Sequence, residues 1–306
     1  MCTFVETSDI RVLIDAGVAL GPRFRKLPHP LEYKARNECR ARIREYATKA
    51  DVVIVSHYHN DHHTPNYTET VWIGCSPDEA EAVYGDKTVL VKDSRNFINF
   101  SQRRRGWMFQ RFAKKVGEKC EVADGKVFEF GSTKVRFSQP VPHGEVESGL
   151  GWLLMTCVES GERKFLHASD VQGPISKQTT QLILKEKPDV LVLGGPPLYL
   201  QGFKVPIETI QMGIGNAAKI ARKIPLMVLE HHLLRSENWR EAAKPIYESA
   251  EATRHEVVTA AEYLKQPSTE LEFTRESLYE KAPPSEAFMK WTKLREPKRR
   301  LQVPPI

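Results

Sequence analysis

Four of the ten histidines in this 306-residue chain lie within seven consecutive positions. The segment has the form His57-x-His59-x-Asp61-His62-His63 and directly follows an apolar run of strand length. Two imidazoles two residues apart on a turn can hold one metal ion, and the aspartate and histidine that follow can hold a second ion beside it. The spacing therefore predicts a dinuclear metal site in preference to a solvated polar loop.

Further candidate ligands follow strand-like segments later in the chain. They are His143, Asp170 and either His231 or His232. A single histidine or aspartate at the end of a strand is more often a packing or capping residue. After a motif of this kind, however, we expect each of them to help complete the metal site. We expect His231 as the final ligand, because it is the nearer of the two to the preceding apolar segment, with His232 as the alternative.

The order of these residues resembles the pattern of the metallo-β-lactamase superfamily. That pattern is an early aspartate after a strand, His-x-His-x-Asp-His, a distant histidine, a distant aspartate and a final histidine. All five elements occur in order between Asp15 and His231. Within the superfamily, residues 56–65 and 230–235 are most similar to the compact archaeal predicted hydrolases of unassigned substrate.

The resemblance implies a fold and a set of ligands. The fold is an α/β (α+β) four-layer αββα sandwich, with two divalent metal ions in a groove between its sheets. The implied ligands are His57, His59 and His143 for the first ion; Asp61, His62 and the final histidine for the second; and Asp170 as the bridge. The ions are usually Zn²⁺, and a ligand set without a thiolate also allows Mn²⁺ or Fe²⁺.

Other residues near the motif have implied or open roles. The resemblance implies that Asp15 supports the site by hydrogen bonding, and we count Asp15 and Asp61 as the catalytic carboxylates. His63 lies outside the ligand pattern, so it orients a ligand, faces the substrate groove or is a partly exposed neighbour. His167 lies within a predicted strand, where a buried structural histidine is expected. Glu230 is a candidate proton shuttle or an ordinary carboxylate at a strand end.

Hydrolysis is the expected chemistry. Two cations that share a water lower its pKa from about 15.7 toward neutrality, which supplies hydroxide for attack on an ester, lactone or phosphodiester. A redox diiron role is disfavoured, because flavodiiron-type members of the superfamily tend to have a carboxylate at the position of His59.

The substrate is either a nucleic acid or a small molecule. A nuclease is suggested by the net charge of +6 and by residues 103–115, in which basic and aromatic side chains are interleaved. The candidate substrate-binding residues there are Arg103, Arg104, Arg105 and Trp107. The alternative interpretation is an amphipathic helix with a solvated basic face. The interval between Asp170 and His231 is too short for the inserted domain of β-CASP nucleases, and no flexible arm of the transfer-RNA 3′-processing kind is found.

The second hypothesis is a small-molecule lactonase or phosphoesterase. The Gly-Gly-Pro-Pro turn at 194–197 could approach an anionic substrate, although a purely structural loop is the simpler interpretation. A third hypothesis, a non-catalytic scaffold, would require lost ligands, and every position of the pattern is filled.

Alternating patterns predict the elements that position these residues. We expect a hairpin at 3–7 and 11–14, a helix at 31–47, a buried strand at 52–55, a strand at 88–92 and a helix over 94–116. Two more hairpins are predicted at 126–130 with 134–138 and at 152–158 with 164–167. From residue 178 onward, helices and strands alternate, which is typical of a parallel sheet covered by helices.

Composition limits the remaining possibilities. With 41% hydrophobic and 27% charged residues, the chain is expected to be globular. Its apolar runs are far shorter than the roughly 18 to 20 residues of a membrane span. No secretory signal is recognisable and the five cysteines lack a Cys-x-x-Cys pair, so we expect a cytoplasmic protein with reduced thiols and no membrane partner.

We predict one main domain over 1–284, with a C-terminal helix and a basic, proline-containing tail over 285–306. The oligomeric state is left open.

Overall fold

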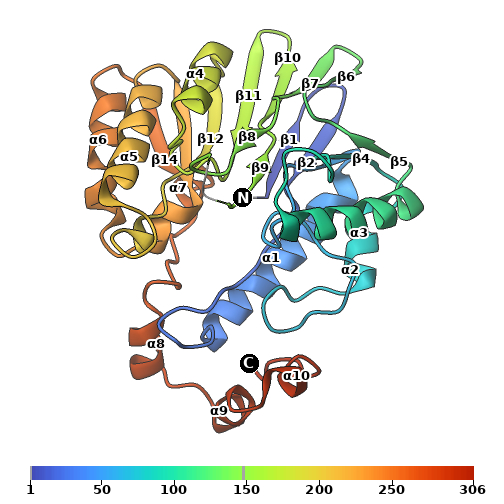
Figure 1. The fold of residues 1–306 in the computed structure, drawn as a ribbon, viewed down its shortest axis with the longest axis vertical. Coiled ribbons are helices and arrows are strands. Elements are labelled where there is room, and N and C mark those ends of the chain that lie inside the picture. The colour runs from blue at the N-terminus through green and yellow to red at the C-terminus, as the bar shows by residue number, and fades with distance from the viewer. Residues whose placement is uncertain (1, 147–148) are drawn as a thin grey trace.

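Two β-sheets pack face to face between two layers of helices in the computed structural model, which describes residues 2–146 and 149–306 (Figure 1). The first sheet has the strand order β1-β2-β3-β4-β5. Its strands are β1 (Thr3–Glu6), β2 (Arg11–Ile14), β3 (Val52–Val55), β4 (Thr88–Val91) and β5 (Lys119–Val122). The pair β1 and β2 is antiparallel, and the later neighbours are parallel.

The second sheet has the order β14-β13-β12-β11-β10-β7-β6. Its strands are β6 (Val127–Phe130), β7 (Thr133–Phe137), β10 (Thr156–Ser160), β11 (Arg163–Ala168), β12 (Val190–Gly194), β13 (Leu226–Glu230) and β14 (Glu256–Thr259). Strands β11 to β14 are parallel, whereas β6, β7 and β10 form antiparallel pairs. The short strands β8 (Val141–Pro142) and β9 (Trp152–Leu153) form a separate ribbon.

Strand β3 explains why one layer of hydrophobic core forms on each face of the first sheet. Successive side chains of a strand point to opposite faces. Val52 and Ile54 therefore pack between the sheets, in the same cluster as Phe137 of β7. Val53 and Val55 face the helices instead. An all-apolar strand is the expected consequence of burial on both faces.

Helices cover the outer face of each sheet (Figure 1). The first sheet is covered by α1 (Pro30–Lys49), α2 (Pro77–Tyr84) and α3 (Phe100–Val116). The second is covered by α4 (Lys177–Glu186), α5 (Ile207–Ala221) and α6 (Trp239–Glu251). This arrangement confirms the αββα sandwich.

The C-terminal segment lies at the N-terminal end of α1 (Figure 1). After α7 (Ala260–Tyr263) it contains α8 (Arg275–Lys281), α9 (Glu286–Thr292) and α10 (Glu296–Arg299). Phe288 and Trp291 pack on Tyr33 of α1. Arg275 is completely buried and pairs with Glu32 of α1, with both nitrogen-to-oxygen distances at 2.8 Å. These contacts tie the segment to the sandwich. Within the described residues, no helix is long and apolar enough to cross a membrane.

Two predicted elements have different limits in the structure. The helix expected from residue 94 begins at Phe100, because the side chain of Asn99 accepts a hydrogen bond from the Gln102 backbone and caps the helix there. The strand expected at 152–158 is divided into β9 and β10. Between them, the backbone N–H of Leu154 donates to the carbonyl of Ser56, so the chain crosses toward the histidine motif before joining the second sheet.

Candidate metal centre

The predicted ligands come together where strands of both sheets end. Asp15 and His231 directly follow β2 and β13, and His57 and Asp170 each lie two residues after the last residue of β3 and β11. The backbones of Asp15, Asp170 and His231 have positive φ angles of 54°, 55° and 67°. Non-glycine residues rarely adopt this left-handed conformation, and such residues concentrate at functional sites. The strained backbones therefore mark the same place as the ligand pattern.

Asp170 lies at the centre of the cluster, and its Oδ2 atom faces most of the early ligands. The Nε2 atoms of His57, His62 and His143 lie 3.2, 3.0 and 2.8 Å from Oδ2. The Nδ1 atom of His59 is 3.8 Å away. One donor set, made of His57, His59, His143 and Asp170, has all its ligand atoms within 4.8 Å of one another.

The other oxygen of Asp170, Oδ1, faces the late ligands. Nε2 of His231 lies 2.9 Å from Oδ1 and 3.5 Å from Oδ2 of Asp61. Nε2 of His232 lies 3.2 Å from Oδ1. Asp61, His62 and His231 form a second donor set of metal-binding dimensions. The sequence therefore anticipated residues that the fold brings together, and both adjacent histidines face the cluster.

The residues present fit a pair of divalent cations. Among the described residues, the buried atoms without a hydrogen bond include Nε2 of His62, His231 and His232 and Oδ1 of Asp170. These atoms are close together but are not aligned as donors and acceptors. Buried polar atoms in native proteins nearly always have a partner. Cations at their common focus would satisfy all four, and nitrogen and oxygen donors without a thiolate suit Zn²⁺, Mn²⁺ or Fe²⁺.

Asp15 has a carboxylate oxygen within 4.8 Å of ring nitrogens of His57 and His62, and it positions the His62 ring. Its Oδ2 atom lies 2.8 Å from Nδ1 of His62 and accepts a 2.6 Å hydrogen bond from Oγ of Ser56. Its Oδ1 accepts from the Ser56 backbone N–H at 2.8 Å. Burial would raise the pKa of Asp15, but the neighbouring His62 lowers it to about 2. The ionised carboxylate thus fixes the ring so that Nε2 points at the cluster, as carboxylate partners of ligand histidines commonly do.

Other ring nitrogens are also held by neighbours. Nδ1 of His57 lies 3.0 Å from Oγ of Ser56, and Nδ1 of His143 lies 3.3 Å from Nε2 of Gln172. Nε2 of His59 lies 3.2 Å from Nε2 of Gln102, a completely buried side chain on α3 whose Oε1 accepts from the Tyr58 backbone. Sequence reasoning missed Gln102, because a lone glutamine within a basic segment carries no signal.

The electrostatics of the cluster favour ligand chemistry. Burial lowers the pKa values of His57, His59, His231 and His232, which keeps these imidazoles neutral, the form that binds metal. Burial would also lower the pKa of His62, but the carboxylates around it raise it. The surrounding histidines lower the pKa of Asp170 despite its burial. The centre therefore combines ionised carboxylates with mostly neutral imidazoles.

His63 is not the partly exposed neighbour that was one of its three expected roles. It is buried, its Nδ1 lies 2.8 Å from the carbonyl of His59, and its ring packs edge-on against Tyr58 and Phe109. Burial lowers its pKa to about 3. The expectation of a partly exposed histidine was wrong, because α3 covers this side of the motif. His63 instead braces the turn that presents His59.

Two glycines allow the loops of the centre to approach closely. A Cβ at Gly17 would lie 2.4 Å from the backbone nitrogen of His63, and one at Gly194 would lie 2.6 Å from that of Asp170. Any larger residue would displace the ligand loops. In the Gly-Gly-Pro-Pro turn at 194–197, the first glycine is therefore required for packing against the backbone of Asp170. His167 is buried within β11, and Glu230 at the end of β13 accepts a 2.8 Å hydrogen bond from Oγ of Ser169.

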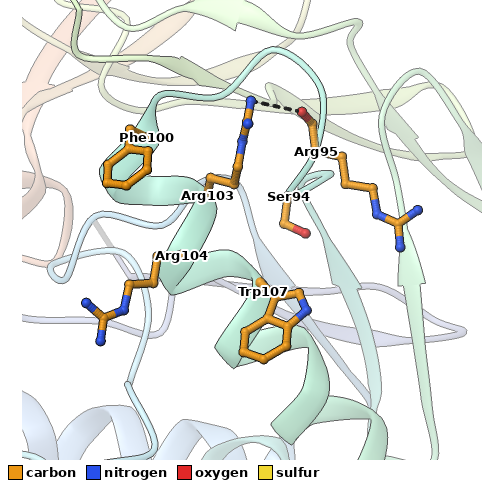
Figure 2. A pocket seen from close by; sticks show the side chains of 6 residues that line it. All are labelled: Ser94, Arg95, Phe100, Arg103, Arg104 and Trp107. Atoms are coloured by element: carbon orange, nitrogen blue, oxygen red, sulfur yellow. Dashed lines mark hydrogen bonds between the residues drawn. The ribbon is translucent and has the colours of Figure 1, made fainter.

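The predicted substrate-binding residues divide between two faces of α3. Arg103, Arg104 and Trp107 line a surface pocket of about 370 Å³ together with Ser94, Arg95 and Phe100 (Figure 2). Phe100 is 86% exposed and Trp107 is 54% exposed. Arg105 points elsewhere, with Nη1 3.5 Å from Oδ1 of Asn60 in the histidine motif. Helix α3 therefore presents a basic and aromatic face outward and contacts the candidate metal centre through Gln102 and Arg105.

Comparison with known families agrees with this geometry. The model of the beta-lactamase superfamily domain matches residues 10–232, a range that contains every predicted ligand. The chain belongs to the beta-lactamase superfamily. A UPF0282 protein of Thermococcus sibiricus is 38% identical to it over 281 residues, which make up 91% of this chain and 89% of that protein. A UPF0282 protein of Methanopyrus kandleri is also 38% identical, over 91% of this chain and 94% of its own.

These relatives place the chain in the UPF0282 group of archaeal homologues and confirm the resemblance inferred from the motifs. Among solved structures, CmlA, a diiron beta-hydroxylase from Streptomyces venezuelae, is similar with a TM-score of 0.50 and 13% identity. The similarity covers 84% of this chain, which spans about half (51%) of the CmlA chain. At this identity, the likeness shows a shared superfamily fold and does not bear on the reaction.

The two adjacent histidines can be distinguished by metal content. We expect His231→Ala to lose one of two bound ions, because Nε2 of His231 lies near both Asp61 and Asp170. We expect His232→Ala to retain both, because Asp61, His62 and His231 still form a complete donor set and Nε2 of His232 is farther from Asp170 than that of His231. Elemental analysis of the two variants, reconstituted in parallel, measures the difference. Loss of an ion from His232→Ala alone would move the final ligand by one residue.

Proposed function

We propose that this superfamily member is a dinuclear, metal-dependent hydrolase of an ester or phosphodiester, with Zn²⁺ as the preferred metal. The observation that supports the proposal is the position of Asp170, whose two carboxylate oxygens face different groups of imidazoles. A carboxylate shared in this way is suited to bridge two cations. The other members of the donor sets lie around it in loops that follow strands of the two sheets, except His143, which follows β8 of the separate ribbon.

Bound there, two divalent cations would acidify water and polarise the substrate oxygen. The chain itself supplies the orientation. Asp15 holds His62, Gln102 contacts His59, and Ser56 holds both Asp15 and His57. Turnover of bis(p-nitrophenyl) phosphate and p-nitrophenyl acetate by the metal-loaded chain, and its loss in the Asp170→Asn variant, tests the proposal.

A nuclease is the second candidate function, and the outer face of α3 favours it. Exposed aromatic rings at Phe100 and Trp107 lie beside Arg95, Arg103 and Arg104 in one pocket (Figure 2). Arginine side chains bind backbone phosphates, and aromatic rings stack on unpaired bases. The opposite, buried face of the same helix contacts His59 through Gln102, so the proposal requires a bound strand to continue past the edge of α3 to reach the candidate metal centre.

We expect the metal-loaded chain to bind single-stranded RNA with an affinity that falls as salt rises, if this face serves a nuclease. Combined replacement of Arg103, Arg104 and Trp107 by alanine should reduce affinity by about 10- to 100-fold and lower the salt slope by about 0.7 for each lost phosphate contact. Fluorescence anisotropy at several salt concentrations measures both quantities. Lys114→Ala with Lys115→Ala, at the far end of α3, is the control. Absent binding, or binding insensitive to salt, would remove this candidate.

A further inference from the structure

A second cluster of charged and aromatic side chains lies beside the candidate metal centre. Its members are Arg23, Tyr199, Arg235 and Glu272, which come from four separate segments of the chain. Nη2 of Arg235 is 3.8 Å from Oδ2 of Asp61, and the hydroxyl of Tyr199 is 3.1 Å from Nδ1 of His232. The cluster therefore contacts Asp61 of the second donor set and His232, which lies beside that set.

Glu272 holds the two arginines side by side. Nε of Arg235 lies 3.3 Å from one oxygen of Glu272, and Nε of Arg23 pairs with the other. The guanidinium carbon of Arg23 lies 3.8 Å from the centroid of the Tyr199 ring, and that of Arg235 lies 5.8 Å from it. Glu272 pairs with the Nε atom of each arginine, and the Tyr199 ring packs against the guanidinium groups. These contacts orient the terminal nitrogens of both arginines.

The terminal nitrogens of the two arginines differ in their contacts. Among the described residues, the Nη atoms of Arg23 make no hydrogen bond, whereas Arg235 interacts with the hydroxyl of Tyr199 and makes long contacts with Nδ1 of His232 at 3.5 Å and with Asp61 at 3.8 Å. The side chains of Arg23 and Arg235 are 23% and 21% exposed. The two guanidinium charges face the carboxylates of Glu272 and Asp61, so a ligand oxygen would be bound by directed N–H groups and not by an excess of positive charge.

This chemistry favours a ligand with anionic oxygens, and a phosphoryl group is the one that also suits hydrolysis at a dinuclear metal centre. Guanidinium groups bind phosphate oxygens through paired, charge-assisted hydrogen bonds, and an oriented arginine loses little conformational freedom on binding. An uncharged ester or lactone offers no anionic oxygen to such a group.

We infer that Arg235, aided by Arg23, forms an anion subsite that binds a non-bridging oxygen of a phosphodiester substrate beside Asp61 and His232. The inference rests on the proposed hydrolase function and narrows its substrate class from esters in general to phosphoesters. Glu272 and Tyr199 are positioning residues, because they act through the arginines.

Inorganic phosphate is the probe for the subsite. Calorimetric titration of the metal-loaded protein is expected to show a dissociation constant about 10- to 100-fold weaker in Arg235→Met than in the parent, since a hydrogen bond to a charged group contributes that much. Arg23→Met should have a smaller effect of the same sign, and Arg235→Lys should recover part of the loss. Arg163→Met is the control, because Arg163 is 87% exposed and begins β11, the strand whose other end precedes Asp170.

A kinetic comparison separates substrate binding from a structural role. In Arg235→Met, kcat/KM for bis(p-nitrophenyl) phosphate should fall together with phosphate affinity, and it should fall by a clearly larger factor than kcat/KM for p-nitrophenyl acetate. Metal content is measured on every sample. Unchanged phosphate affinity at full metal content would overturn the inference, and so would an equal loss on both substrates.

The failure of the subsite and the failure of the proposed function give different results. If the parent hydrolyses the acetate ester and does not bind phosphate, the hydrolase proposal stands and the subsite is wrong. If the parent hydrolyses neither substrate but binds phosphate in an Arg235-dependent manner, the anion subsite stands and the hydrolase proposal is wrong.

Discussion

Replacing Asp170 with asparagine is expected to abolish hydrolysis and to reduce bound metal to near zero. The carboxylate lies within 3.2 Å of five imidazole nitrogens, from His57, His62, His143, His231 and His232. The amide of asparagine has the same shape but no charge, so it cannot neutralise cations in this buried position. We expect activity to fall by at least about 100- to 1000-fold, the scale set by removal of a single preorganised charge-stabilising group.

Elemental analysis and turnover of bis(p-nitrophenyl) phosphate measure the two effects on the same preparation. Asp78→Asn is the matched control, because it makes the same chemical change at an exposed residue in the first turn of α2. Circular dichroism checks that the Asp170 variant remains folded. A folded Asp170→Asn protein that keeps two ions and full activity would contradict the bridging role. Loss of metal without any activity in the parent would leave a metal-binding scaffold as the better interpretation.

Removal of metal from the parent is expected to lower its melting temperature by on the order of 10 °C. A ligand present at 1000 times its dissociation constant stabilises the native state by about 4 kcal/mol. For a chain of this size, each kcal/mol corresponds to a few degrees. The structural reason is that Asp15, Asp61 and Asp170 are ionised beside one another, and the unpartnered nitrogens of the centre gain ligand bonds only in the metal-bound state.

Differential scanning calorimetry with and without a chelator measures this shift. Re-addition of Zn²⁺ or Mn²⁺ after the chelator is removed should restore the original melting temperature. The Asp170→Asn variant serves as the control, because its melting temperature should not respond to either treatment. A parent protein whose melting temperature is unchanged by chelation and by added metal would argue against a structural contribution from the proposed ions.

Much of the fold could be predicted from local patterns. The all-apolar segment at β3 indicated burial on both faces, and the alternation of helices and strands after residue 178 indicated a parallel sheet under helices. Both predictions were confirmed because they depend on the period of side chains along a strand or helix. The division of β9 from β10 and the start of α3 at Phe100 were missed. The division depends on the long-range contact of Leu154 with Ser56, and the start of α3 depends on the cap that Asn99 forms with the Gln102 backbone.

The candidate site shows the same division. The identity and order of the candidate ligands were evident in the sequence, because metal binding restricts the residue types and because ligands placed after parallel strands meet at one edge of a sheet. Only the tertiary structure decided that His232 faces the centre beside His231, that Gln102 contacts His59, and that His63 is buried. The cluster of Arg23, Tyr199, Arg235 and Glu272 was also invisible, because its members are separated along the chain and follow no local period. A sequence records which residues can do chemistry, whereas the packing of distant loops determines which of them share a surface.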